Sequence, residues 1–527
     1  MCASMNDKET RAMVFFGNAS AFVDAANILY REHNFIPVFW SGASKHKTLV
    51  ESMFDKVDFY DPLIHGIYSK LPESMNLELS YRRIDPKLIR DLAFSERVYM
   101  EMIYTRADPG GGFSFYEVRK IYYEYLVFSF SLLEEYQPDV IIFDTTPHMM
   151  WDYVLYIVAK HCRINVIIFN DTPFPGRMVV FRDLDPCLPA GNYRHKEDAY
   201  TEESVVISPD VKSYIESLKK DFRSGAAYTF KAELLKGNVR AYMSSAEISK
   251  RLKKNKKSVI SAVRREKWKE LLNKGSKNRK KHYLKQSGVA WSYSFQSTYS
   301  FQSQRLADID KRMELLANYD SHSCVPDLNA PYVYFPLHWQ PENSTVPMGG
   351  LFSDLHLALT LLREAIPDNW KIYIKENPGQ FEWHRGSFAR HEAYYDEMAS
   401  IEGVTLVNTE SDSYDLIDYS KCVFTITGTT GWEAIVRGKP VLIAGNCVWY
   451  TGAPNLHRVR SLADIEKAIQ HIQGQSVNSS IGDLDKFILE FIKKSYFCVI
   501  DPAYVDELIG DKKKNTDEIV RAVINNL

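Results

Sequence analysis

Short apolar runs alternate with helix-like segments in two separate parts of this sequence. Continuous β-branched and aromatic runs of this kind predict parallel strands that are covered by helices on both faces. The first part has runs at residues 13–16, 35–40, 139–143 and 165–169, and the second part has runs at residues 332–337, 370–374, 404–407, 422–426 and 440–444. The chain is therefore expected to hold two doubly wound α/β domains, with ligands bound where the strands end.

The 527 residues are too many for one ordinary hydrophobic core, so several units are expected. The strand rhythm disappears between the two α/β parts, where Lys, Glu and Leu dominate, and helix-like patterns finish the chain at residues 480–494 and 516–526. We predict a Rossmann-like domain at residues 1–204, a helical basic insertion at 205–329, a second Rossmann-like domain at 330–478 and C-terminal helices at 479–527.

The composition narrows the class of protein. The first residues are polar, and no later stretch reaches the ~20 apolar residues of a membrane span, so neither a secretory signal nor a membrane helix is expected. The seven cysteines are scattered and show no CxxC spacing. This pattern favours reduced thiols in a cytoplasmic protein and predicts neither a disulfide framework nor a structural zinc.

The most informative motif is a Thr/Gly turn between a predicted strand and a predicted helix, TITGTTGWEAIV at residues 425–436. Gly428 and Gly431 would let main-chain amides approach a ligand closely, and the helix start favours phosphate. Three threonine hydroxyls could add donors: Thr427, Thr429 and Thr430. Glu433, one turn into the helix, could accept the ribose hydroxyls of a nucleotide. Alternatively, the glycines allow tight packing and the threonines cap the helix.

Polar residues also follow the first two strands of the second α/β part. His338, a candidate catalytic residue, and Gln340 and Glu342, candidate donor-binding residues, come directly after the first strand, where they are expected to project at the rim of an inter-domain cleft. Lys375 ends the next strand, and there it could neutralise a departing phosphate or diphosphate. A structural role for the histidine and a solvated strand end for the lysine are the alternatives.

Several spaced segments of the second part occur together in one order: YFPLHWQPENSTVPMGG, WKIYIKENPGQ, DSYDLIDYS, and TITGTTGWEAIVRGKPVLIAG followed by WY. They resemble the capsule and surface-polysaccharide biosynthesis glycosyltransferases over about 125 residues, and PHMMWDYVLYIVAK at residues 147–160 resembles the N-terminal half of that family. The resemblance implies a GT-B-like fold of two Rossmann-like domains facing a cleft. It also implies a nucleotide-sugar donor held by the C-terminal domain, and no cofactor or essential metal.

One departure from related families concerns the donor. Families that use CMP-activated acidic sugars have a His-Pro pair that contacts the donor phosphate, whereas this chain has Asn377-Pro378. An amide donates a hydrogen bond but cannot protonate a leaving phosphate, which counts against a CMP donor.

In a GT-B enzyme the acceptor lies mainly on the N-terminal domain, so the base that activates it is expected in that domain's loops. Asp144 follows its strand immediately and His148 opens the next helix, so either could deprotonate a sugar hydroxyl. Both could instead be structural, as a helix cap and a packed polar residue. The loop at residues 17–20 is a further candidate, and Asn170, Asp171, Thr172 and Arg177 are weaker ones.

Residues 250–285 carry sixteen Lys/Arg against two Glu, which leaves the rest of the chain near −16. This segment could be a solvated helical face, a dock on an anionic membrane surface, or a binding strip for an anionic glycan or lipid-linked acceptor. Membrane docking is slightly favoured, because lipid-linked acceptors lie at the inner leaflet in surface-polysaccharide assembly. No nucleic-acid recognition motif accompanies the charge.

The leading hypothesis is a cytoplasmic glycosyltransferase, peripheral on the inner face of the plasma membrane, that transfers sugar from a nucleotide-sugar to a saccharide or lipid-linked glycan. Two other classes fit the same motifs. One is a sugar-nucleotide epimerase or hydrolase of the same architecture, and the other is a non-catalytic capsule-assembly scaffold.

Overall fold

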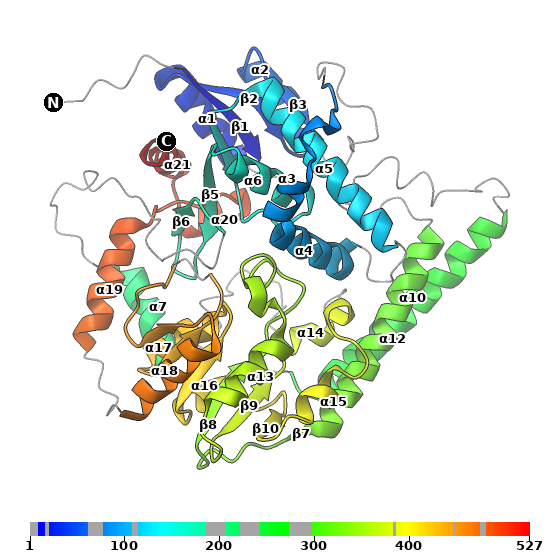
Figure 1. Ribbon diagram of the computed structural model, residues 1–527, viewed down its shortest axis with the longest axis vertical. Helices are drawn as coiled ribbons and strands as arrows, with labels where there is room; N and C mark the ends of the chain where they lie inside the picture. The colour runs from blue at the N-terminus through cyan, green and yellow to red at the C-terminus, as the bar shows by residue number, and fades with distance from the viewer. Residues whose placement is uncertain are drawn as a thin grey trace.

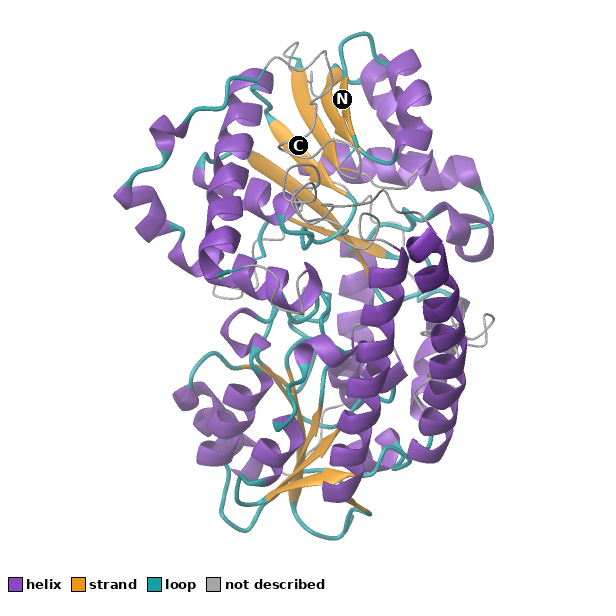
Figure 2. Cartoon of the chain, turned by 90° about the vertical axis from the view of Figure 1, so that its right-hand side faces the viewer, coloured by secondary structure: helices purple, strands orange, loops and turns teal. Residues whose placement is uncertain are grey.

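The computed structural model describes residues 9–15, 20–61, 77–107, 114–184, 207–221, 243–272, 298–382, 386–446, 449–474 and 481–527. Two β-sheets, one above the other, are each packed between helices (Figure 1). Figure 2 shows the same two sheets from the side.

The N-terminal sheet has six strands in the order β3-β2-β1-β4-β5-β6, and only the β5–β6 pair is antiparallel. Its strands are β1 (Thr10–Phe15), β2 (Phe35–Ser41), β3 (Asp58–Tyr60), β4 (Val140–Phe143), β5 (Asn165–Asp171) and β6 (Met178–Phe181). The order of the first five strands is that of a Rossmann domain, whose topological switch point lies between β1 and β4.

Helices cover both faces of this sheet. On one face, aromatic and aliphatic side chains of α4, α5 and α6 meet Met13, Phe15 and Phe143. On the other face, α1 and the last helix of the chain, α21, meet Val14 and Ile142, so the C-terminus returns to the N-terminal domain. The helices of this domain are α1 (Ser20–Glu32), α2 (Lys47–Met53), α3 (Pro86–Asp91), α4 (Ala93–Met102), α5 (Phe115–Tyr136), α6 (Trp151–His161), α20 (Pro502–Leu508) and α21 (Lys512–Asn526).

The C-terminal sheet has seven parallel strands in the order β13-β12-β11-β8-β9-β10-β7. Its strands are β7 (Ser323–Cys324), β8 (Tyr332–Pro336), β9 (Lys371–Lys375), β10 (Val404–Val407), β11 (Cys422–Thr425), β12 (Val441–Ile443) and β13 (Leu456–Arg458). Counted from β8, the six main strands repeat the Rossmann order, and the switch point lies between β8 and β11.

This sheet is also covered on both faces. Alternate residues of β8 point to opposite sides: Val333 and Phe335 pack against α13 and α18, whereas Tyr332 and Tyr334 pack against α16 and α17. The helices of this part are α13 (Leu355–Ala365), α14 (Gly379–Glu382), α15 (Tyr394–Ala399), α16 (Ser413–Asp418), α17 (Thr429–Val436), α18 (Leu462–Gly474) and α19 (Ile481–Lys494).

The described part of the basic insertion is mostly helical and includes strand β7 near its end. It contains α7 (Pro209–Lys219), α10 (Ser245–Leu272) and α12 (Thr298–His322). Ser245 bonds to Asp320 and Lys256 pairs with Asp310, so α10 and α12 run antiparallel as a hairpin along one side of the molecule (Figure 1).

The carboxyl ends of the two sheets face each other at the domain junction. Thr146, in the loop after β4, donates a hydrogen bond from its hydroxyl to the Met348 sulfur, in the loop after β8. Phe174, in the loop after β5, packs its ring 5.2 Å from that of Trp432 on α17. The prediction of two Rossmann-like domains in a GT-B-like arrangement is confirmed, while the exact domain boundaries stay predictions.

One predicted element is wrong. The sequence pattern of residues 384–401 predicts one continuous helix, but the described chain contains a short 3-10 helix (Gly386–Ala389) and α15 instead. The reason is close contact at Gly386, whose carbonyl accepts a hydrogen bond from Gln380; a Cβ at this glycine would lie 1.7 Å from the Gln380 carbonyl oxygen. The short strands β3, β6, β7 and β13 were not predicted; β3, β7 and β13 lack a continuous apolar run that would mark them.

None of the described helices is both long and apolar enough to cross a membrane.

Candidate functional site

The Thr/Gly turn lies where the sequence predicted it, between β11 and α17 at the switch point of the C-terminal sheet. Gly428 is the N-cap residue of α17 and offers no side chain to bond the first amides of the helix. By contrast, Asp354 caps α13 and Asp412 caps α16 through their carboxylates. Gly428, Thr429 and Thr430 are partly exposed. The N-terminus of α17, which is the positive end of the helix dipole, is therefore uncapped and open to solvent at the domain junction.

The glycines of the turn are required by close contacts. A Cβ at Gly428 would lie 2.8 Å from the Thr425 hydroxyl and 3.1 Å from a ring carbon of His338. At Gly431 it would lie 2.6 Å from the hydroxyl of Tyr450, which donates to the Gly428 carbonyl. The turn is thus fixed by its neighbours, and any larger residue would displace them.

His338 joins the loop after β8 to this turn. Its Nε2 accepts the amide of Ile426 at 3.1 Å and that of Thr427 at 3.4 Å, which places the ring proton on Nδ1. The Thr425 hydroxyl lies 3.1 Å from the same nitrogen and also accepts the Gly428 amide. Burial, with a contribution from the Arg390 charge, lowers the pKa of His338 to about 4, so the ring is neutral at physiological pH.

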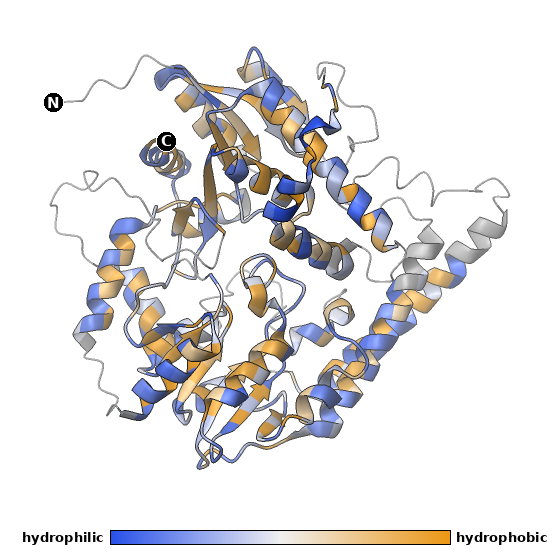
Figure 3. Ribbon diagram, viewed as in Figure 1, coloured by the Kyte–Doolittle hydropathy of each residue, from blue (hydrophilic) through white to orange (hydrophobic). Residues whose placement is uncertain are grey.

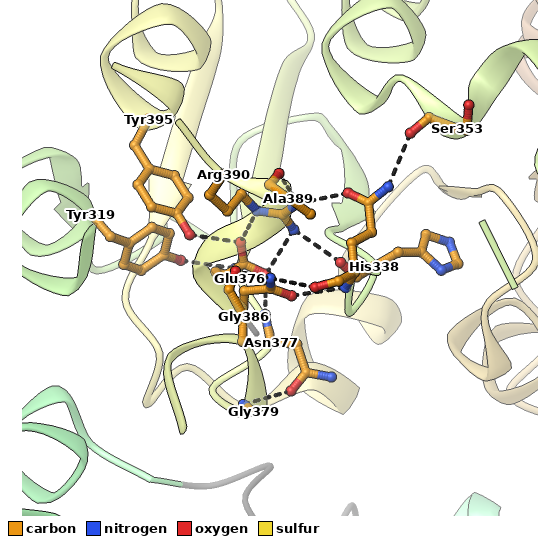
Figure 4. Close-up of polar contacts among 12 residues, drawn as sticks. Tyr319, His338, Ser353, Glu376, Asn377, Gly379, Gly386, Ala389, Arg390 and Tyr395 are labelled. Atoms are coloured by element: carbon orange, nitrogen blue, oxygen red, sulfur yellow. Dashed lines mark hydrogen bonds and ion pairs between the residues drawn. The ribbon is translucent and has the colours of Figure 1, made fainter. Parts of the chain in front are cut away.

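A buried ion pair lies behind His338 (Figure 4). Arg390 Nε lies 2.9 Å from Glu376 Oε2, and Arg390 Nη2 donates to the His338 carbonyl at 2.9 Å. Tyr395 donates to the same Glu376 carboxylate at 2.7 Å. Burial opposes ionisation of Arg390, but the adjacent Glu376 outweighs this and raises its pKa. The charged pair therefore holds the main chain of the His338 loop.

The expectation that His338 and Gln340 project at a cleft rim is wrong. Both side chains are buried. Gln340 donates to the Ser353 carbonyl at 3.0 Å and accepts from Arg390 Nη1 at 2.6 Å. His338 Nε2 and the side-chain amide of Gln340 both find partners inside the protein, so both side chains stabilise the loop from the interior. Glu342, by contrast, is exposed and accepts the Ser344 hydroxyl at 2.6 Å.

Lys375 does not lie at an exposed strand end. Its ammonium donates to the Ser411 carbonyl at 2.6 Å and to the Ser413 hydroxyl at 3.1 Å, at the start of α16. Burial lowers the pKa of Lys375 to about 8, and Asp412 acts in the opposite direction. Its role as counter-charge for a leaving phosphate stays a prediction. Asn377, nearby and exposed, accepts the Gly379 amide at 2.9 Å and so caps α14.

Glu433 is a buried carboxylate on α17. Its side chain is 5% exposed, and within the described residues it has neither a hydrogen bond nor an ion pair. Burial raises the pKa of Glu433 to about 7, although the charge of Arg437 partly offsets this. A buried carboxylate without a partner is costly, so a ligand hydroxyl at this point would be stabilising.

The N-terminal domain supplies its own switch-point loop, residues 144–150. His148 Nδ1 lies 2.6 Å from the Thr146 carbonyl, which assigns the proton to Nδ1 and leaves the lone pair on Nε2. Asp152 accepts the amide of Met149 at 2.7 Å and that of His148 at 3.4 Å, fixing the start of α6. Asp144 is partly exposed, and its amide bonds to the Phe15 carbonyl.

Other predicted candidates are placed as follows. Residues 17–19 and the side chain of Ser20 lie outside the described part. Asn170 donates to the Thr146 hydroxyl at 3.2 Å, and Arg177 donates to Ser495 at 3.1 Å. Burial raises the pKa of Asp171, with Asp501 adding to the effect. Among the described residues no cluster of His, Cys, Asp or Glu is arranged to hold a metal ion, and metal independence stays a prediction.

Sequence reasoning missed the Glu376–Arg390 pair. Glu376 stands beside Lys375 in a motif that was noticed, and two consecutive charged residues at a strand end could have raised the question of a buried partner. Arg390 gave no signal, because it fell inside the helix wrongly predicted for residues 384–401.

Residues 327–468 match the family described as "Capsule polysaccharide biosynthesis protein". The resemblance seen in the sequence is thereby confirmed for the C-terminal sheet. No curated protein matches the chain.

Three solved structures are similar at low identity. KpsC of Thermosulfurimonas dismutans, a beta Kdo 2,7 transferase, is 13% identical, with 79% of this chain and 97% of that chain covered and a TM-score of 0.29. UDP-GlcNAc 2-epimerase of Methanocaldococcus jannaschii is 10% identical, with coverages of 92% and 99% and a TM-score of 0.24. CalG4, the calicheamicin glycosyltransferase, is 10% identical, with coverages of 98% and 98% and a TM-score of 0.22. These likenesses are too distant to assign an activity.

Proposed function

We propose that the chain is a glycosyltransferase that uses a nucleotide-sugar donor. Its residues 327–468 match the capsule polysaccharide biosynthesis family. The observation that carries the proposal is the meeting of the β8 and β11 loops at the C-terminal switch point. There an uncapped helix start, formed by Gly428 to Thr430, lies beside a loop that touches the N-terminal domain. Switch points are where open α/β sheets bind nucleotides.

Two features of α17 support a donor site at this point. The amides of Thr429 and Thr430 would bind a phosphate oxygen, since a helix N-terminus favours negative charge. Glu433, one turn further along, would accept the ribose hydroxyls and so gain the partner that it lacks. Neither of these two interactions requires a metal ion or a cofactor.

The acceptor would approach from the N-terminal domain. His148 Nε2 would take the proton of an acceptor hydroxyl as its oxygen bonds to the anomeric carbon of the donor sugar. The bond between that carbon and the phosphate oxygen breaks, and the nucleotide leaves with the negative charge held at α17. Asp144 is the second candidate base in the same loop.

A thermal-shift panel of UDP-, GDP-, CMP- and dTDP-sugars tests donor binding. At least one should raise the melting temperature of the full chain. Gly428→Ala, which crowds Thr425 and His338, should abolish the shift. Gly474→Ala is the matched control, because a Cβ there meets nothing within 4 Å and that glycine ends α18 far along the chain.

Product analysis separates transfer from the other activities. With a saccharide acceptor, the wild-type chain should release nucleotide and extend the acceptor in equal amounts. An epimerised or freely hydrolysed nucleotide-sugar without acceptor would replace our proposal with an epimerase or hydrolase. No shift and no turnover with any member of the panel would indicate a non-catalytic scaffold.

A further inference from the structure

Helix α10 exposes an unusually uniform charge. Between Ile248 and Arg265 it carries eight Lys/Arg and no Asp or Glu. Seven of the eight are exposed, and Lys256 is half-buried. Solvated helix faces in ordinary proteins mix both signs, so this face differs from a simple soluble surface.

The cations stand opposite the side that packs on the protein. Ile248, Leu252 and Val259 are buried in the core shared with α12. At 100° per residue, a second set falls within a single arc on the other side of the helix: Lys250, Lys253, Lys254, Lys257 and Arg264. With a rise of ~1.5 Å per residue, this set spans roughly 21 Å. We call these five residues the basic ridge.

The basic ridge is not neutralised by the described part of the protein. Two other cations of α10 have carboxylate partners: Arg251 lies 3.4 Å from Glu382, and Lys256 pairs with Asp310. None of the five ridge residues has an ion-pair partner in the part of the chain that the structure describes. Their charges therefore remain available to an outside anion.

We infer that the basic ridge docks the protein onto an anionic phospholipid surface. The hairpin lies at the edge of the molecule, and the described part of α10 carries hydrophilic residues along it (Figure 3). The five side chains stand on a straight, convex helix surface, which can meet a flat surface along its length, whereas a glycan chain is usually held in a groove. Because the apolar side of α10 is already used by α12, binding would be electrostatic and without insertion.

The charge of the rest of the chain would orient the protein. Residues outside 250–285 sum to near −16, so an anionic membrane repels most of the molecule and attracts the insertion. The protein would therefore bind with α10 toward the lipid headgroups rather than in random orientations.

Vesicle co-sedimentation of the full chain tests this inference. Vesicles of phosphatidylcholine mixed with phosphatidylglycerol should pellet the protein at low salt, and pure phosphatidylcholine should not. A cation near an anionic surface contributes about five-fold in affinity, so Lys253→Gln/Lys254→Gln/Lys257→Gln should weaken binding about 100-fold. Raising salt toward 1 M, where the Debye length falls to about 3 Å, should release the wild-type chain.

A control with the same change in net charge is Lys467→Gln/Lys512→Gln/Lys513→Gln, three exposed lysines on α18 and α21. It should bind the vesicles like the wild type, and both triple variants should keep the wild-type melting temperature. An equal loss of vesicle binding in both triple variants would mean that net charge alone drives the binding, and it would overturn the inference. So would binding to a soluble anionic polysaccharide through the ridge with no binding to anionic vesicles. Neither outcome depends on sugar transfer.

Discussion

The guanidinium of Arg390 donates to the main-chain carbonyl of His338 at 2.9 Å, and the His338 ring in turn accepts two amides of the turn that begins α17. The segment before α15 and the loops after β9, β8 and β11 are therefore linked in one buried chain of hydrogen bonds. The ion pair of Arg390 with Glu376 anchors one end of that chain, and the uncapped helix start forms the other.

Removing one member of this ion pair should destabilise the fold strongly. Arg390→Met leaves Glu376 buried without its counter-ion, and Glu376→Gln does the same to Arg390, so each should lower the free energy of unfolding by about 3–5 kcal/mol. The double variant should cost less than the sum, because neither charge is then stranded. Urea unfolding of the four proteins measures the coupling, and additive losses would contradict it.

His338 should act as a hydrogen-bond acceptor rather than as a catalytic base. His338→Gln keeps an oxygen acceptor near Nε2 and should retain nucleotide-sugar turnover within about ten-fold, whereas His338→Ala strands two buried amides, at about 1–3 kcal/mol each. Steady-state kinetics of both variants give the measurement. Loss of kcat in His338→Gln equal to that in His338→Ala would mean that the imidazole itself transfers a proton.

The low pKa of His338 also predicts a pH effect. Its pKa falls from 6.5 to about 4 on folding, so the unfolded chain gains the proton first as pH is lowered. The stabilisation is complete above pH 6.5 and is lost as pH falls toward 4, by about 3 kcal/mol. Melting temperatures across this range should fall more steeply for the wild type than for His338→Gln.

Glu433 should make nucleotide binding depend on pH near neutrality. Its folded pKa of about 7 means that the carboxyl is protonated below this value. Ribose hydroxyls donate to the ionised form, so affinity should rise with pH and level off above 7, by about ten-fold from pH 6. Calorimetric titration of the nucleotide found by the thermal-shift panel checks this, and the Glu433→Gln variant should show a flat profile.

The same raised pKa predicts a change in the stability of the unliganded chain. The unfolded state ionises Glu433 from pH 4.5 upward, whereas the folded state does so only near 7, so the wild type loses stability over that window. Glu433→Gln should therefore be the more stable protein at pH 8, by up to about 3 kcal/mol, and equal to wild type at pH 4. A difference that persists at pH 4 would point to packing instead of ionisation.

His148 is expected to carry the proton transfer. His148→Ala should lower kcat by about 10²–10⁴-fold while the KM for the donor changes little, because the residue stands on the opposite domain from the donor turn. Asp144→Asn is the comparison variant, since Asp144 lies in the same loop as His148. If Asp144→Asn shows the large kcat loss and His148→Ala does not, the base is Asp144.

The sequence by itself determined most of the architecture. VIIF at β4 is buried along its whole length, and in YVYFP at β8 only the final proline is partly exposed; continuous apolar runs of this kind are typical of parallel strands covered on both faces. The turn at residues 425–431 was predicted in its true place, since glycine and threonine between a strand and a helix leave a local signature. Local patterns thus identified the switch-point loops.

Only the tertiary structure decided which polar side chains are buried and which partners they find. His338, Gln340 and Lys375 are polar residues at strand ends, which predicts exposure, yet all three are buried because residues distant in sequence supply their partners: Ile426, Arg390 and Ser411. Glu433 was singled out from the sequence as a possible ribose anchor, but its burial without a partner among the described residues was visible only in the structure. A hydrogen bond between residues about 35 to 90 positions apart leaves no mark on local sequence, since only the packing of the sheet brings the two together.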